Sequence, residues 1–146
     1  MLQIKVASQR TGQGLCMENA PLGATRPLVV LVDDDSAVLV SLKFVLEMEG
    51  FSVLAYENAE DLMREAPRVD PACFVIDYHL PGANGLDLMH NLRGKGLSAP
   101  VILITTNPSR VLLRQARVEG ATIVEKPLLS NSLLEAVRSS VSQDLN

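Results

Sequence analysis

The chain has 146 residues, of which 47% are hydrophobic and 21% charged, and its net charge is −4. These proportions are typical of a globular protein and exclude a chain that is disordered throughout. The excess of acidic residues argues against nucleic-acid binding, and no apolar run approaches the roughly 20 residues of a membrane-spanning helix. The N-terminus has no signal-peptide pattern, so the expected location is the cytoplasm.

Residues 1–27 differ from the rest of the chain because they show no sustained hydrophobic period. Two Gly-containing stretches, 11–14 and 21–23, are typical of loops. We therefore predict a flexible N-terminal extension over 1–27, with a docking arm as the alternative, and one compact domain over 28–146.

Short apolar runs alternate with helical patterns from residue 28 onward. The runs, which predict strands buried on both faces, are 28–32, 52–55, 74–76, 101–104 and 122–124. The helical patterns lie at 38–50, 58–65, 86–92, 108–118 and 133–141, with Ser130 a candidate N-cap of the last one. This alternation predicts an α/β fold of (βα)₅ type, a doubly wound parallel sheet of five strands with helices on both faces.

The first predicted helix is unusually apolar. Its predicted core face consists of Val38, Leu42, Val45 and Leu46. A second flank carries Ala37, Val40, Phe44 and Met48. A neighbouring loop or the N-terminal extension could cover this flank, but we favour a docking stripe for a partner.

Arginines line the predicted fourth helix at positions 110, 114 and 117. A solvated face is the first interpretation and a partner-binding face the second. His90 is expected on the outer side of the third helix, without a ligand-like neighbour.

Carboxylates follow the first and third predicted strands, where Asp33, Asp34 and Asp35 end one run and Asp77 ends the other. In parallel sheets, functional groups gather beyond the carboxyl ends of the strands. Asp35 suits an N-cap, but capping needs one such residue and not three. Carboxylates this close repel one another, and Mg²⁺ with its oxygen ligands is the simplest compensation.

The last two strands end in Thr105 and Lys126. Each has an ordinary interpretation, as a β-branched strand residue and as a solvated loop lysine. Next to the carboxylates of the other strands, they instead favour phosphoryl transfer, in which positioning and charge stabilisation dominate. An aspartyl phosphate is the expected covalent product.

Four blocks, found in this order, carry a resemblance to the receiver domain of bacterial two-component response regulators over roughly residues 28–144. They are 31–35, the D-x-x-L-P-G-x-x-G stretch at 77–85, 100–105 and the Lys126–Pro127 pair. The resemblance implies a flavodoxin-like fold with strand order 2-1-3-4-5.

The resemblance also implies a set of site residues. Asp77 would be the phosphoacceptor, and Asp33 and Asp34 the acidic pair. Mg²⁺ would be held by Asp34 and Asp77, by Asp33 partly through water, and by the backbone carbonyl of His79.

By the same resemblance, Thr105 and Lys126 would contact the phosphoryl group. The phosphoryl donor would be a phosphohistidine on a histidine kinase or histidine phosphotransfer protein. The chain would be a signalling protein and not an enzyme, acting through protein contacts on a downstream protein target. Because the sequence ends about where the receiver does, we expect a single-domain regulator.

Three positions depart from the family pattern, one of which is Leu128, which stands where Phe is common. Ile123 stands where an aromatic ring usually rotates together with the conserved Thr, which puts that switch in question. Thr106 stands where a small residue such as Ala is usual, and it is expected to narrow access to the phosphoryl group.

Two other functions fit part of the pattern. A haloacid-dehalogenase-like phosphohydrolase would use Asp33 as nucleophile, but it would leave Asp77 without a task and lacks an acidic pair beyond Lys126. An unphosphorylated receiver-like scaffold would not need the intact set of site residues.

Overall fold

The structure of the chain is a computed structural model, and it describes residues 26–128 and 131–145. The predicted extension, apart from Arg26 and Pro27, and the predicted N-cap Ser130 lie outside the described residues.

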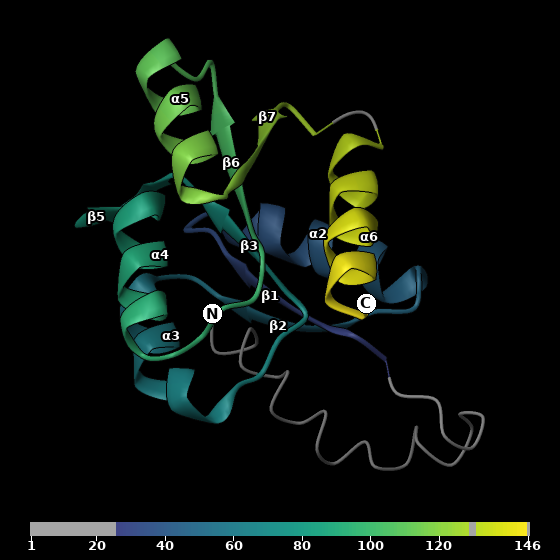
Figure 1. Cartoon of the computed structure of the whole chain (residues 1–146). Helices are drawn as coiled ribbons and strands as arrows, with labels where there is room; N and C mark the ends of the chain where they lie inside the picture. The colour runs from purple at the N-terminus through teal and green to yellow at the C-terminus, as the bar shows by residue number, and fades with distance from the viewer. Residues whose placement is uncertain (1–25, 129–130, 146) are drawn as a thin grey trace, which may run out of the picture.

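Five parallel strands form the central sheet, namely β1 (Leu28–Val32), β2 (Ser52–Tyr56), β3 (Cys73–Asp77), β6 (Val101–Thr106) and β7 (Thr122–Lys126). They are ordered β2-β1-β3-β6-β7. In chain order this is 2-1-3-4-5, so the predicted fold and strand order are confirmed. This order makes β1 and β3 neighbours, so their carboxyl ends lie next to each other (Figure 1).

Helices cover both faces of the sheet (Figure 1). They are α2 (Ser36–Met48), α3 (Ala59–Glu65), α4 (Gly85–Gly94), α5 (Arg110–Glu119) and α6 (Ser132–Leu145). In Figure 1, α3, α4 and α5 lie on one side of the sheet, whereas α2 and α6 lie on the other. Among the described helices, none has both the length and the apolar character needed to cross a bilayer.

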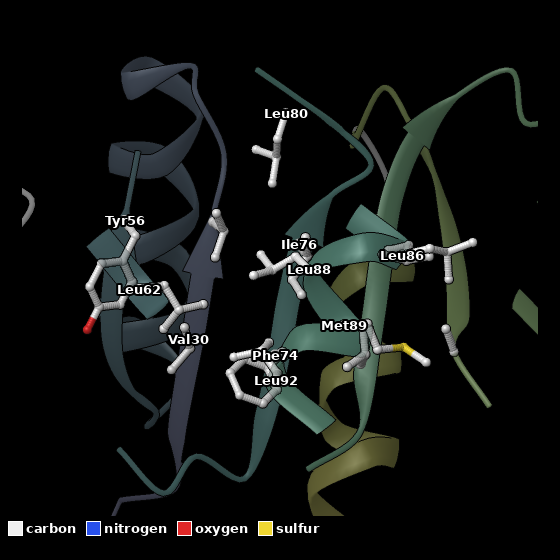
Figure 2. Close-up of a cluster of buried hydrophobic side chains, with 14 of the residues drawn as sticks. Val30, Tyr56, Leu62, Phe74, Ile76, Leu80, Leu86, Leu88, Met89 and Leu92 are labelled. Atoms are coloured by element: carbon white, nitrogen blue, oxygen red, sulfur yellow. The ribbon is translucent and has the colours of Figure 1, made fainter. Parts of the chain in front are cut away.

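The sheet divides the interior into two hydrophobic cores. Along β3, Phe74 and Ile76 pack into the core beneath α3, α4 and α5, which we call the α3–α5 core (Figure 2). Cys73 and Val75 pack into the core beneath α2 and α6, the α2–α6 core. Successive side chains of a strand point to opposite faces, so one buried strand supplies both cores.

Three short elements were not predicted. Strands β4 (His79–Leu80) and β5 (Ala83–Asn84) form an antiparallel hairpin, and η2 (Ala66–Arg68) is one turn of 3₁₀ helix. The sequence analysis predicted no strand at 79–84, because strands of two residues are too short to show a period of two. Gly82, with φ at 84°, lies between the hairpin strands in a conformation that glycine adopts without strain.

The predicted core face of α2 is wrong at one position. Val45 is 46% exposed, whereas Leu39, absent from the prediction, is buried together with Leu46. The predicted second flank does lie on the outside, with Val40 and Phe44 each 64% exposed. Because α2 is apolar around most of its circumference, periodicity alone could not choose the inward face.

Candidate functional site

The structure brings together the carboxylates that follow β1 and β3. Oxygen atoms of Asp33, Asp34 and Asp77 all lie within 4.8 Å of one another. Asp33 and Asp77 are buried, with 2% and 4% of their surface exposed, whereas Asp34 is exposed at the rim. Two buried acids beside a third one form a cluster that hydrophobic packing alone does not explain.

Backbone hydrogen bonds fix the two buried carboxylates. The Asp33 amide donates to Tyr56 O at 3.1 Å, which extends the β1–β2 ladder, and Asp33 Oδ1 accepts from the Asp35 amide at 2.9 Å. On the neighbouring strand, Asp77 Oδ1 accepts from the His79 amide at 3.2 Å. Each side chain is therefore oriented by the turn that follows its strand.

Lys126, the last residue of β7, lies opposite this pair. Its Nζ is 3.5 Å from Asp33 Oδ2 and 3.5 Å from Asp77 Oδ2. One ammonium group between two carboxylates compensates only part of their charge.

Burial dominates the electrostatics of Asp33 and raises its pKa to about 6. The hydrogen bond from the Asp35 amide and the Lys126 ammonium oppose this rise, while the Asp77 carboxylate adds to it. The fold therefore buries Asp33 in an environment that disfavours its ionised form.

The donor set fits a hard divalent cation. Three carboxylates offer oxygen ligands within a small volume, and Asp33 Oδ2 is buried with the Lys126 ammonium 3.5 Å away but without a hydrogen bond from any described residue. A buried oxygen in this state is expected to receive a ligand that the protein itself does not supply. Few carboxylates with one exposed side favour Mg²⁺, which keeps several of its waters.

Thr105, on β6, also lies at the carboxyl ends of the sheet strands. It is 1% exposed, and its Oγ1 has no hydrogen-bond partner within 26–128 and 131–145. Its neighbour Thr106 is exposed. A buried hydroxyl without a partner is the second unsatisfied polar group at this edge.

Asp35, the third acid of the run, has a structural task. It is the N-cap of α2 and accepts hydrogen bonds from the amides of Ala37 and Val38. As predicted, Asp35 is the residue of the acidic run that caps the helix.

A groove of about 620 Å³ adjoins the site between α2 and the segment that follows β7. Its lining residues are Ala37, Val38, Ser41, Leu42, Val45, Thr106, Lys126, Pro127 and Leu128. Lys126 thus contacts the carboxylates and also lines the groove. The sequence pattern missed this surface, because it assigned Val38, Leu42 and Val45 to the core.

His90, expected to lie without a ligand-like neighbour, contacts Glu119 of α5. The contact joins the exposed sides of α4 and α5. It corrects the sequence interpretation, which had no means of pairing residues so far apart in the chain.

Comparison with known proteins gives one consistent result. A family model described as the response regulator receiver domain matches residues 29–138. The transcriptional regulatory protein FixJ of Azorhizobium caulinodans is 34% identical over 116 residues, which cover 79% of this chain and 55% of that protein. The chain spans about half the length of the FixJ relatives it matches.

Solved structures agree with the sequence relatives. The crystal structure of FixJ-N is 31% identical, with a TM-score of 0.73 over 82% of this chain and 96% of that one. A CheY-like receiver domain protein from Methanospirillum hungatei, at 24% identity and a TM-score of 0.74, shares the fold over 82% of this chain and 97% of its own. The chain therefore belongs to the response regulator receiver domain family, whose members are signalling domains of two-component systems and not classical enzymes.

Proposed function

We propose that the chain accepts a phosphoryl group on Asp77 from a phosphohistidine of a partner protein, in a Mg²⁺-dependent reaction, and signals through protein contacts. The observation that carries this proposal is the position of Lys126 Nζ, 3.5 Å from the carboxylates of both Asp33 and Asp77. Such a cluster supplies a nucleophile together with groups that stabilise phosphoryl charge.

The chemical step assigns Asp77 as the nucleophile. One Asp77 carboxylate oxygen forms a bond to phosphorus while the P–N bond of the donor breaks, and its electron pair returns to the imidazole nitrogen. Lys126 pairs with a phosphoryl oxygen, and the Thr105 hydroxyl, which has no partner among the described residues, donates a hydrogen bond to another. Receiver-type activity of this kind modifies only the chain itself.

Receiver domains typically bind Mg²⁺ in an acidic pocket, and the present donor set suits it. Asp33, Asp34, Asp77 and the backbone carbonyl of His79 are the proposed ligands. When bound, the ion would neutralise negative charge on the phosphoryl oxygens.

Receiver domains of response regulators interact with histidine kinases. For this chain we assign the donor, a histidine kinase or a histidine phosphotransfer protein, to the groove beside Lys126 and the apolar flank of α2. Val40, Phe44 and Met48 expose 64%, 64% and 70% of their surface on that helix. An apolar surface next to the phosphoacceptor suits a partner that must present its histidine there.

The test is intact-mass spectrometry after treatment with acetyl phosphate and Mg²⁺. Wild type should gain one phosphoryl group, and Asp77→Asn should gain none while keeping its circular dichroism spectrum. Asp35→Asn is the matched control, because it makes the same chemical change in the adjacent acidic run and Asn also caps helices well. It should be modified like wild type.

Two results would contradict the proposal. Modification of Asp77→Asn would remove Asp77 from its role. Loss of modification in Asp33→Asn, combined with retention in Asp77→Asn and repeated turnover of the phosphodonor, would favour the phosphohydrolase with Asp33 as nucleophile.

A further inference from the structure

The groove beside Lys126 has more apolar surface than phosphoryl transfer itself requires. Its volume of about 620 Å³ lies within the range of roughly 300–1,000 Å³ that is typical of small-molecule sites. Leu42 and Leu128 pack against the α2–α6 core and also line the groove, so its wall continues that core. Val45, which is 46% exposed, belongs to the same wall. The apolar lining residues are Ala37, Val38, Leu42, Val45, Pro127 and Leu128.

Lys126 joins this apolar groove to the proposed phosphoacceptor. Its Nζ lies 3.5 Å from Asp77 Oδ2, and the same residue lines the groove. Thr106, its partner in the β6–β7 register, also lines the groove and is exposed. A phosphoryl group held by the Lys126 ammonium therefore lies at the groove, and a chain attached to that group can extend along the apolar wall.

The groove and the exposed flank of α2 are separate surfaces. Val40, Phe44 and Met48 are exposed, but none of them lines the groove. An exposed helix flank suits a protein partner, whereas a concave apolar site with a few polar groups suits a small amphipathic molecule. None of the described residues that line the groove is aromatic, which favours an aliphatic chain over a stacked ring as the occupant.

We propose that the groove binds the chain of an aliphatic acyl phosphate of medium length, and that the site uses this molecule directly as a phosphoryl donor. The inference rests on the proposed function, in which Asp77 accepts the phosphoryl group, and it adds the chemical class of a small-molecule donor. The acyl chain packs on Leu42 and Val45, and Lys126 pairs with the phosphoryl oxygens.

The transfer step balances without a further reactant. An Asp77 carboxylate oxygen forms a bond to phosphorus, the P–O bond to the acyl oxygen breaks, and the electron pair of that bond stays on the acyl oxygen. The acyl group leaves as a carboxylate, so no proton is needed. Apart from Lys126, the polar side chains of the described lining are Ser41 and Thr106, whose hydroxyls are available to donate hydrogen bonds to this carboxylate.

Chain length separates this inference from phosphoryl acceptance alone. Acetyl, butyryl and hexanoyl phosphate release carboxylates of nearly equal basicity, so their intrinsic reactivity is similar. Each methylene that becomes fully buried is expected to strengthen binding by a factor of about four. Because the groove is partly open to solvent, we expect the second-order rate constant of modification to be at least about tenfold higher for hexanoyl than for acetyl phosphate.

The experiment measures these rate constants on the full chain with Mg²⁺ by intact-mass spectrometry. The readout is the ratio of the rate constants for hexanoyl and acetyl phosphate, in which any effect common to both donors cancels. Val45→Asp should lower this ratio by at least about threefold, because a carboxylate in the groove wall disfavours an apolar chain. If Val45→Asp does not fold, Val45→Ser replaces it, with a smaller expected loss.

Val118→Asp is the matched control. It makes the same change at a valine of α5 that is 79% exposed and does not line the groove, so the ratio should equal that of wild type. Circular dichroism verifies that both variants are folded.

Three results would overturn the inference. Equal rate constants for the three donors, while acetyl phosphate still modifies Asp77, would exclude a chain site and leave the proposed function intact. A chain-length preference that Val45→Asp and Val118→Asp change equally, or not at all, would place the chain elsewhere. Absence of modification by every donor, phosphoramidate included, would overturn the inference together with the proposed function.

Discussion

At the scale of single residues, the buried carboxyl of Asp33 lowers the stability of the fold. Its carboxyl is 2% exposed, it lies within 4.8 Å of two other acids, and its pKa is raised to about 6, mainly by burial. A fold optimised for stability alone would place a neutral side chain there. The stability lost by burying this carboxyl is consistent with a site that binds a cation.

We predict that Asp33→Asn stabilises the protein in metal-free buffer, by about 1–3 kcal/mol near neutral pH. The pKa of about 6 lies above the ordinary value of 3.8, so the native state holds its proton more tightly than the unfolded chain. The free energy of unfolding of wild type should therefore fall as pH rises from about 4 to about 6. The variant, with no carboxyl at this position, should lack that component of the fall, so its advantage shrinks in acid.

Urea unfolding at several pH values measures this difference. Asp70→Asn, which alters an exposed acid, is the control and should change stability by less than about 0.5 kcal/mol. Addition of Mg²⁺ should raise the stability of wild type more than that of Asp33→Asn. A variant that is less stable than wild type throughout the pH range would show that the buried charge is fully compensated.

The residues of the site could be predicted, but their energetics could not. A carboxylate, a hydroxyl or a lysine at the end of an apolar run is visible in the sequence, and parallel strands bring those ends together. The double contact of Lys126 and the burial of Asp33 depend on side-chain positions that no local pattern encodes. The assigned roles of these residues stay predictions.

At the scale of elements, strands were easier to predict than helix faces. Strands β1, β3 and β6 are short apolar runs with little ambiguity, because both of their faces are buried, whereas β7 at the side of the sheet is buried only at Val124. In α2, apolar residues surround most of the helix, so the inward position of Leu39 and the outward position of Val45 follow from tertiary packing. Hairpin β4–β5 was missed because its strands have two residues each.

The start of α4 provides a prediction at this scale. A Cβ at Gly85 would lie 2.8 Å from Leu103 Cδ2 and 3.1 Å from both Asp77 O and Tyr78 Cα. We expect Gly85→Ala to destabilise the protein by about 1–3 kcal/mol and to slow the proposed modification of Asp77, because the backbone of Asp77 and Tyr78 must shift.

Gly94→Ala is the matched control at the other end of α4. A Cβ there meets nothing within 4 Å, so the higher helix propensity of Ala should leave stability unchanged or raise it by up to about 1 kcal/mol. Urea unfolding and the rate of modification by acetyl phosphate measure both effects. Similar behaviour of the two variants would mean that the close packing at Gly85 relaxes freely.

At the scale of the whole molecule, stability depends on two cores that share one sheet. Phe74 is fully buried in the α3–α5 core (Figure 2), whereas Phe44 on α2 is 64% exposed. The same substitution, Phe to Ala, can therefore be made once in the core and once on the surface. Comparing the two variants tests whether the exposed flank of α2 contributes to the stability of the fold.

We predict that Phe74→Ala costs about 3–5 kcal/mol, a large share of the 5–15 kcal/mol typical of domains. Phe44→Ala should cost less than about 0.5 kcal/mol. Urea unfolding measures both, and Phe74→Leu, with a smaller expected loss, serves if Phe74→Ala does not fold. A loss at Phe44 as large as that at Phe74 would show that the α2 flank packs against the chain itself.

The alternation of side chains along β6 has a consequence for how the site communicates. Val101 and Leu103 point into the α3–α5 core, so Thr105 continues their side of the strand. Asp77, by the same alternation, continues the side of Cys73 and Val75, toward α2 and α6. The carboxylate of Asp77 and the hydroxyl of Thr105 therefore lie on opposite faces of the sheet, so the proposed hydrogen bond from Thr105 to a phosphoryl group on Asp77 would connect the two cores.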